Sequence, residues 1–293
     1  MKKTKLYMDT FVDIQVVSTK SKRETEAKID RAFKAFQHVE QACSRFTPSS
    51  ELMQVCQSVG VPVKISPFLF EPLFIAIEMA KLTKGLFDPT LGKVMELNGF
   101  NRHYISGQMM NSKSADSVSY HDIELDAFNH TVTLKKPLVI DLGAVAKGFA
   151  IDLAANELKE FTGFVINAGG DLFASGVGEN GEAWKIGIQH PYQKDSIIET
   201  IEISNEAICT SGSYERRNPS KSDLHHLVNP ITKCSPNEWI SCSVIAPFAM
   251  MADAFSTAVF LLGVKKGKQL IEQLALKGLL ITSELEINKV GGI

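Results

Sequence analysis

The sequence has no marked surplus of charge of either sign. Its 293 residues include 31 Lys and Arg against 33 Asp and Glu, which leaves a formal net charge of −2 at pH 7. A nucleic-acid groove and a polybasic membrane anchor both require a local excess of positive charge. This balance argues against nucleic acid as a partner and favours small molecules or proteins.

Long hydrophobic runs are also missing. No apolar stretch approaches the ~20 residues that a helix needs to cross a membrane. The basic residues 1–5 are followed by a segment that Asp9, Asp13 and Gln15 interrupt, so a signal-peptide core and an N-terminal lipobox cysteine are both lacking. We expect a cytoplasmic protein with no membrane span, or a cell-envelope protein only if a leader has been removed.

The cysteines show no pairing pattern. Cys43, Cys56, Cys209, Cys234 and Cys242 are odd in number and contain no C-x-x-C pair, so neither a disulfide framework nor a zinc site is indicated. Internal repeats and low-complexity linkers are absent as well. A chain of this length can form one large domain, and we expect residues 1–293 to be a single domain, with room for two lobes.

Periodicity predicts helices and strands along the whole chain. Alternating, branched segments indicate strands, whereas apolar residues spaced by three and four indicate helices. The predicted helices cover residues 23–42, 66–85, 144–161, 250–262 and 265–276. The predicted strands cover residues 11–17, 122–126, 131–134, 138–141, 163–167, 184–191, 198–203, 207–210, 239–245 and 278–282. This order predicts an α+β fold with mixed β-sheets and flanking helices.

A carboxylate and a hydroxyl share one face of a predicted helix. In residues 250–262, Asp253 and Thr257 are four positions apart in an otherwise apolar run that stops at Gly263. Burying Asp253 unpaired would be unfavourable, and a Mg²⁺ ion held by a carboxylate, a hydroxyl and carbonyl oxygens would remove that cost. Alternatively, Asp253 caps the helix and Thr257 bonds to a backbone carbonyl. These residues alone leave both interpretations open.

Two turns contain glycine where a ligand could approach the backbone. The predicted strand 138–141 leads through residues 142–143 into a helix, a junction that can present backbone N–H groups to phosphate. Residues 167–171 include Gly169 and Gly170, which would let a flat ligand or a pyrophosphate come close. Ordinary turns are the alternative for both.

Four stretches combine these features in a definite order and spacing. They are DLGAVAKG at residues 141–148, NAGGD at 167–171, TSGSY at 210–214 and ADAFST at 252–257. With further stretches at 8–11, 44–46, 87–92 and 226–230, nearly the whole chain resembles the ApbE family of FAD:protein FMN transferases. The resemblance implies an ApbE-like or T-fold-like architecture with two lobes around an FAD cleft.

The resemblance further implies a magnesium-dependent transferase. Such an enzyme splits the pyrophosphate of FAD, attaches FMN to a threonine or serine hydroxyl in the flavinylation motif of an acceptor flavoprotein, and releases AMP. Magnesium would neutralise pyrophosphate charge and help to align the nucleophile. By similarity, Asp253, Thr257 and the backbone carbonyl of Ala144 would bind the metal.

Further residues are implied as contacts of FAD. Judged without the resemblance, Arg45 could instead face solvent. The implied contacts are Cys43, Ser44, Arg45, Asp88, Asp141, Lys147, Asn167, Gly169, Gly170, Asp171, Ser211 and Gly212.

His226 and Asp253 are the implied catalytic residues. His226 matches a family histidine proposed as the base for the acceptor hydroxyl, and an unperturbed pKa near ~6.5 would suit that task. In an extended segment His225 would point elsewhere, and a structural role is the alternative for either histidine. This sequence departs from the family pattern at two positions of the turn after His226. The family often has aspartate where this chain has Asn229, and glycine where it has Lys233.

Two other functions would use the same pocket. A hydrolase would cleave FAD to FMN and AMP with water as the acceptor and the same metal. A non-catalytic flavin-binding or storage protein would need no metal. Only the transferase requires that a loop of another protein can reach the reacting phosphorus.

Overall fold

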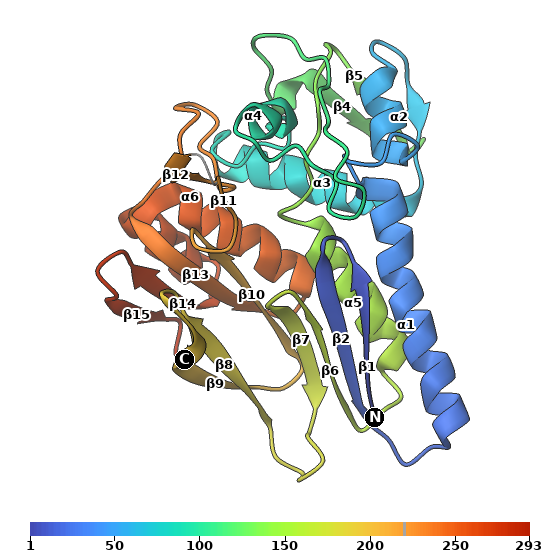
Figure 1. The fold of residues 1–293 in the computed structure, drawn as a ribbon, viewed down its shortest axis with the longest axis vertical. Coiled ribbons are helices and arrows are strands. Elements are labelled where there is room, and N and C mark those ends of the chain that lie inside the picture. The colour runs from blue at the N-terminus through green and yellow to red at the C-terminus, as the bar shows by residue number, and fades with distance from the viewer. Residues whose placement is uncertain (219–220) are drawn as a thin grey trace.

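The computed structural model describes residues 1–218 and 221–293 of the chain. A large antiparallel sheet organises the fold. Helices lie on one face of this sheet, and a smaller group of helices and strands lies at the upper end in Figure 1. The eight strands, in order across the sheet, are β1 (Lys2–Tyr7), β2 (Thr10–Val17), β6 (Gly163–Ala168), β7 (Asp171–Gly176), β10 (Glu206–Gly212), β13 (Trp239–Ala246), β14 (Lys277–Thr282) and β15 (Ile287–Val290).

Both faces of the middle of this sheet are covered. The hairpin of β8 (Trp184–His190) and β9 (Gln193–Ile203) packs on the face opposite the helices, where Ile188 and Ile203 meet Ile240 of β13. Every residue of β13 is consequently buried. In β2 the apolar residues alternate instead, and only the positions that face the helices are buried.

Three helices cover the other face: α1 (Lys22–Cys43), α5 (Ala146–Leu158) and α6 (Ala249–Gln273). A capping box starts α1, in which Ser21 and Glu24 accept each other's backbone N–H. α6 consists of two helical pieces, because Gly263 has a φ of 75°. The helix end predicted at Gly263 is therefore confirmed.

The smaller group packs on the same core. It comprises α2 (Glu51–Gln57), α3 (Pro67–Leu82), α4 (Gly92–Leu97), the short 3-10 helix η1 (Tyr120–Asp122), and a sheet in the order β3 (Val63–Lys64), β5 (Thr131–Leu134), β4 (Ile123–Asp126). A separate pair, β11 (Arg217–Asn218) and β12 (Lys221–His225), lies near α6. One hydrophobic cluster contains Phe36 of α1, Leu73 of α3 and Phe260 of α6, so the smaller group and the helices on the large sheet share a core.

The α+β class is confirmed, and two local predictions are wrong. Residues 138–141 form no strand, and only Val139 makes an isolated bridge, to Leu91. The reason is that the backbone N–H of Asp141 donates to the carbonyl of Pro89 (2.8 Å). This segment therefore pairs with the turn at residues 88–92 rather than with a sheet. β1 is a strand that the sequence pattern misses, because its lysines interrupt the apolar alternation.

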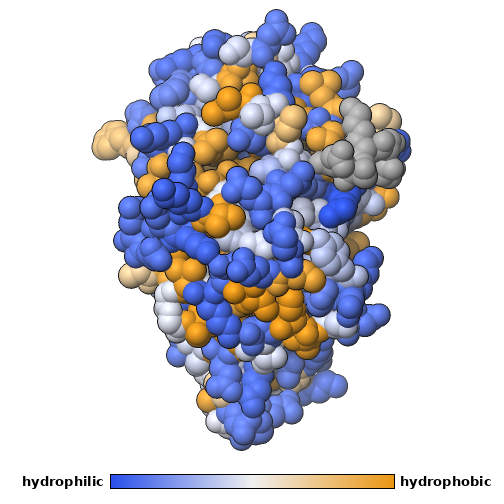
Figure 2. Space-filling view, turned by 90° about the vertical axis from the view of Figure 1, so that its left-hand side faces the viewer, coloured by the Kyte–Doolittle hydropathy of each residue, from blue (hydrophilic) through white to orange (hydrophobic). Residues whose placement is uncertain are grey.

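The described helices were compared with the length and hydropathy of a membrane span. Within residues 1–218 and 221–293, no helix combines the length and apolar character that crossing a membrane requires. Figure 2 shows one face of the molecule, on which hydrophobic patches are separated by hydrophilic side chains.

Candidate active site

Two helices meet where the predicted metal ligands lie. The backbone N–H of Gly148, in the first turn of α5, donates to Oδ2 of Asp253 in α6 at 3.1 Å. A Cβ at position 148 would lie only 2.4 Å from the carbonyl oxygen of Ala249, so this close approach of the helices requires glycine. The contact fixes Asp253 beside the start of α5.

Asp152 holds the first turn of α6 in the same contact. Its carboxylate oxygens accept the N–H groups of Ala249 (2.7 Å) and Met250 (2.9 Å), which have no partner within their own helix. Burial raises the pKa of Asp152 to about 6 against the effect of these hydrogen bonds. Sequence reasoning misses this residue, because its partners are backbone groups far along the chain.

Asp253 is a buried carboxylate with a single hydrogen-bond partner among the described residues. It is 5% exposed, and within the described residues its carboxylate forms no ion pair and accepts only the Gly148 N–H. Burial raises the pKa of Asp253, while the charge of Lys147 and the Gly148 hydrogen bond oppose the rise. Because a buried carboxylate with so little compensation is unfavourable, the site suits a cation.

Other oxygen atoms are available for such a cation. Thr257 is one helical turn beyond Asp253, and its hydroxyl is 2.9 Å from that of Ser211. In the described part of the chain, no hydrogen bond is made to the carbonyl oxygen of Ala144, which precedes α5. Within residues 1–218 and 221–293, no group of three or more His, Cys, Asp or Glu side chains could hold a metal ion. A carboxylate, a hydroxyl and a carbonyl are ligands that suit Mg²⁺.

Lys147 links α5 to the sheet through an ion pair with Asp171. Asp171 is buried at the start of β7 and also accepts the N–H of Thr210 at 2.9 Å. Burial has the largest effect on the pKa of Asp253 and on that of His226. The charge of Lys147 also acts on both groups and lowers both pKa values. Lys147 is therefore within electrostatic reach of both predicted catalytic residues.

Arg45 and Asp141 form a second ion pair at the site. Nε of Arg45 is 2.6 Å from the Asp141 carboxylate, and Nη2 donates to the carbonyl of Phe100 at 2.6 Å. Burial opposes ionisation of Asp141, but Arg45 and the N–H of Gly143 hold its pKa below the ordinary value. Nη1 of the buried Arg45 has no hydrogen-bond partner among the described residues, as expected if a ligand supplies one.

The glycine turn between β6 and β7 has one closed and one open side. Asn167 accepts the N–H of Gly170 (2.9 Å), and both glycines have positive φ. A Cβ at Gly169 would lie 2.4 Å from Oγ1 of Thr10, whereas one at Gly170 would meet no atom within 4 Å. A ligand can therefore approach the backbone at Gly170.

The two adjacent histidines have different environments. His225 is buried, with Nε2 3.0 Å from the carbonyl of Pro236 and its ring edge against Phe260. Nδ1 of His226 is buried and has no partner among the described residues. Burial, with the charge of Arg216 adding, lowers the pKa of His226 to about 3. The ordinary pKa expected for His226 is therefore not retained, and this side chain is neutral at pH 7.

The two sequence departures near His226 do not disrupt the turn. Oδ1 of Asn229 accepts the N–H groups of Ile231 (2.9 Å) and Thr232 (3.1 Å), as an aspartate there would. Lys233 has a φ of 57°, a left-handed conformation that glycine adopts at lower cost. The turn is therefore closed by Asn229, with backbone strain at Lys233.

Three predicted FAD contacts are engaged within the protein. The thiol of Cys43 donates to the carbonyl of Phe68 (3.3 Å), and burial raises its pKa well above the ordinary value. Ser44 accepts the N–H two residues on, at 3.3 Å. Asp88 accepts hydrogen bonds from Thr90 (2.8 Å) and from the N–H of Tyr120 (3.1 Å). These side chains shape the loops beside Arg45 and Asp141.

Ser211 and Gly212 are the last residues of β10, which therefore extends two residues beyond the predicted strand 207–210. The Ser211 hydroxyl faces α6, where it lies 2.9 Å from both Ser256 and Thr257. A Cβ at Gly212 would lie 2.7 Å from the ring of Tyr214. Gly212 thus leaves room for that ring.

Sequence reasoning also missed Arg216, a second charged residue of this region. Its guanidinium is 3.5 Å from the carboxylate of Asp9, in the turn between β1 and β2. Its backbone carbonyl accepts the N–H of His226 at 3.1 Å. The only available signal was its place two residues after the TSGSY stretch.

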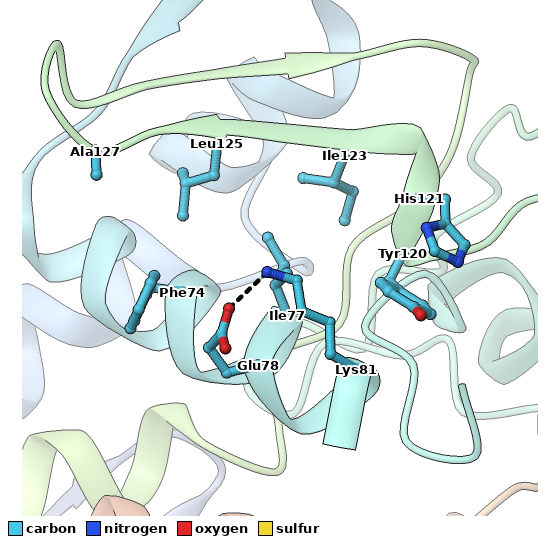
Figure 3. Close-up of a pocket in the computed structure, with 9 residues that line it drawn as sticks. All are labelled: Phe74, Ile77, Glu78, Lys81, Tyr120, His121, Ile123, Leu125 and Ala127. Atoms are coloured by element: carbon cyan, nitrogen blue, oxygen red, sulfur yellow. Dashed lines mark hydrogen bonds and ion pairs between the residues drawn. The ribbon is translucent and has the colours of Figure 1, made fainter. Parts of the chain in front are cut away.

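A cavity of about 280 Å³ lies elsewhere, in the smaller group of elements. Figure 3 shows Phe74, Ile77 and Lys81 of α3 facing Ile123 and Leu125 of β4 across it. None of the predicted site residues lines this cavity. It is separate from the cluster around Asp253.

Proteins named FAD:protein FMN transferase are similar to this chain over most of its length. A protein of Escherichia coli K12 named FAD:protein FMN transferase is 27% identical over 292 residues, covering 94% of this chain and 82% of the relative. A protein of the same name from Chlamydia trachomatis is 28% identical over 255 residues, covering 84% of this chain and 78% of the relative.

Solved structures share the fold. The crystal structure of the ApbE protein of Thermotoga maritima matches with a TM-score of 0.86 and 26% identity, covering 99% of this chain and 96% of that one. The flavin transferase ApbE of Vibrio cholerae matches with a TM-score of 0.83 at 22% identity, over 99% of this chain and 96% of that one. The model of the ApbE family matches residues 8–280, and the chain therefore belongs to the ApbE family.

Proposed function

We propose that this protein transfers FMN from FAD to a serine or threonine hydroxyl of an acceptor flavoprotein, with Mg²⁺ bound, and releases AMP. Family membership and the relatives named FAD:protein FMN transferase support this reaction. The observation that carries the proposal is the buried Asp253 carboxylate, which lies one helical turn from Thr257 and accepts only the Gly148 N–H among the described residues. A magnesium ion would complete it.

The chain's own residues would hold both Mg²⁺ and FAD. Asp253, the hydroxyl of Thr257 and the carbonyl of Ala144 would bind Mg²⁺, which when bound would neutralise pyrophosphate charge and polarise a phosphoryl oxygen. Lys147 would add a positive charge on the same side, since it reaches Asp253 electrostatically. Remaining FAD contacts would come from Arg45, through its unpartnered Nη1, and from the Gly170 turn.

The transfer step would need one proton acceptor. The acceptor hydroxyl oxygen would attack the phosphorus on the riboflavin side, the bond to the bridging oxygen would break, and AMP would carry the displaced oxygen away. His226 would take the hydroxyl proton on Nδ1, which is neutral and unpartnered. Although its pKa is low in the free protein, a pyrophosphate dianion nearby would raise it toward the range useful for a base.

One incubation separates the transferase from its two alternatives. The purified chain would be mixed with FAD, Mg²⁺ and a flavin-acceptor domain, then analysed for in-gel flavin fluorescence and for AMP. A transferase gives fluorescent acceptor and AMP in equal amounts. A hydrolase gives AMP and free FMN with unlabelled acceptor, and a flavin-binding protein gives neither product.

The acceptor side chain can be identified in the same experiment. Changing the acceptor's flavinylated Ser or Thr to Ala should abolish labelling, whereas exchanging Ser and Thr should preserve it. Labelling that persists in the Ala variant would contradict ester formation on a hydroxyl.

A further inference from the structure

Arg216 differs from the other cations of the site in how it is paired. Lys147 and Arg45 each have a carboxylate partner that packing shields, in Asp171 and Asp141. The pair of Arg216 with Asp9 is 3.5 Å long, and the side chains are 51% and 49% exposed. Exposed ion pairs of this kind are weak.

The backbone of Arg216 lies beside that of His226. Its carbonyl accepts the N–H of His226 at 3.1 Å, so the two residues lie side by side just beyond the paired ends of β11 and β12. Beyond the larger effect of burial, its charge also lowers the pKa of Asp141 and of His226. On the opposite side, Asp9 adjoins Thr10, which packs against the Gly169 turn.

We propose that Arg216 is a phosphate-binding residue that exchanges Asp9 for the ligand, leaving the carboxylate when a phosphorylated flavin enters and donating to the phosphate that stays attached to riboflavin. This inference rests on the proposed function, because it deepens the recognition of FAD at the same site. Arg216 thereby makes the site select phosphorylated flavins over riboflavin.

The chemistry of the two partners favours this exchange. A guanidinium presents several N–H donors in a planar fork that matches phosphate oxygens, and a phosphate carries more charge than a carboxylate. Asp9 repels an incoming anion, so it holds Arg216 only while the site is free. The adjacency of Arg216 to His226 assigns the contact to the phosphorus that the acceptor hydroxyl attacks.

Four variants test the exchange. Arg216→Gln removes the charge and keeps a polar side chain of similar reach. Asp9→Asn removes the competing carboxylate, and asparagine tolerates the φ of 62° at this position. The double variant shows whether the two effects are coupled. Arg31→Gln is the matched control. Arg31 of α1 is 52% exposed and pairs with Glu157 of α5 at 3.4 Å, and neither residue belongs to the predicted site.

Affinities for FAD, FMN, AMP and riboflavin are measured by calorimetric titration with Mg²⁺ present. Arg216→Gln should weaken FAD and FMN binding about tenfold or more, because a charge-assisted hydrogen bond is lost, and leave riboflavin and AMP within about twofold. Asp9→Asn should tighten FAD binding about two- to fivefold, a gain that disappears in the double variant. Arg31→Gln should match the parent.

Unchanged FAD and FMN affinity in Arg216→Gln would overturn the inference, and so would an Asp9→Asn effect that persists without Arg216. A loss that is equal for riboflavin and FAD would also overturn it, because it would indicate a structural role. Circular dichroism of each variant excludes misfolding, and Asp9→Asn supplies the test if Arg216→Gln does not fold. If the parent itself fails to bind FAD, the proposed function fails instead.

Discussion

Gly148 and Asp253 are 105 positions apart in the sequence, yet the N–H of one lies 3.1 Å from the carboxylate of the other. This hydrogen bond joins the glycine-rich DLGAVAKG stretch to the helix that carries Thr257. It depends on how closely α5 and α6 approach, and therefore on the missing side chain at position 148. The metal ligands would be fixed in place by packing of two helices rather than by a loop.

Gly148→Ala should disturb both stability and activity. The new Cβ would lie 2.4 Å from the Ala249 carbonyl, so α6 must shift. We expect a loss of about 1–3 kcal/mol in the free energy of unfolding, as for other overpacked sites, and a large loss of FAD cleavage. Urea denaturation and AMP release measure the two effects. Asn156→Ala, at an exposed position of α5, is the control and should change neither; full activity of Gly148→Ala would show that the helix contact does not position the site.

His226→Asn should separate binding from transfer. If His226 acts only on the acceptor hydroxyl, the variant binds FAD and Mg²⁺ almost as the parent does. Labelling of the acceptor should fall about a hundredfold to ten-thousandfold, the usual effect of removing a general base. Fluorescence titration and timed in-gel labelling give the two numbers. If affinity and labelling fall by the same factor, His226 is a pocket residue and the base lies elsewhere.

The stability of the free protein should depend on His226 below neutral pH. Burial lowers the pKa of His226 to about 3 in the folded state, compared with about 6.5 in the unfolded chain. Between these values the unfolded chain binds a proton that the folded chain does not. Stability from this group is thus present above about pH 6.5 and lost as the pH falls toward 3.

Urea denaturation between pH 7 and pH 4 measures this effect, with His226→Asn as the reference. The parent should lose on the order of 2 kcal/mol more than the variant over that range, after allowance for the partial exposure of the ring. Parallel pH curves for the two proteins would show that His226 titrates normally.

Lys233→Gly should stabilise the protein. Lys233 holds a φ of 57° in the turn after His226, and glycine adopts that conformation without a Cβ clash. A gain of about 0.5–1 kcal/mol is expected, after the greater freedom of glycine in the unfolded chain is subtracted. Thermal unfolding measures it. Lys135→Gly, in a turn with φ outside the left-handed region, should destabilise and serves as the comparison.

Sequence reasoning located the four long helices and most strands because their apolar periodicity is strong, and it missed the short helices α2 and α4. It failed at residues 138–141, where three apolar residues are too few to distinguish a strand from a buried loop. It also placed the pairs Lys147–Asp171 and Arg45–Asp141 in one site only through the family resemblance. Asp152 and Arg216 stayed unrecognised because backbone groups and distant turns supply their partners. The cytoplasmic location stays a prediction, which cell fractionation would test.

The central claim is that Asp253 binds the metal that FMN transfer requires, and acceptor labelling by Asp253→Ala tests it most directly. Parent, Asp253→Ala and Thr257→Val would each be incubated with FAD, Mg²⁺ and acceptor domain, with circular dichroism to verify folding. We predict that Asp253→Ala loses labelling and AMP release by several orders of magnitude, because metal stabilisation of the transition state is worth several kcal/mol, and that Thr257→Val loses less, because water can replace a neutral ligand. Near-normal labelling by a folded Asp253→Ala would contradict the account.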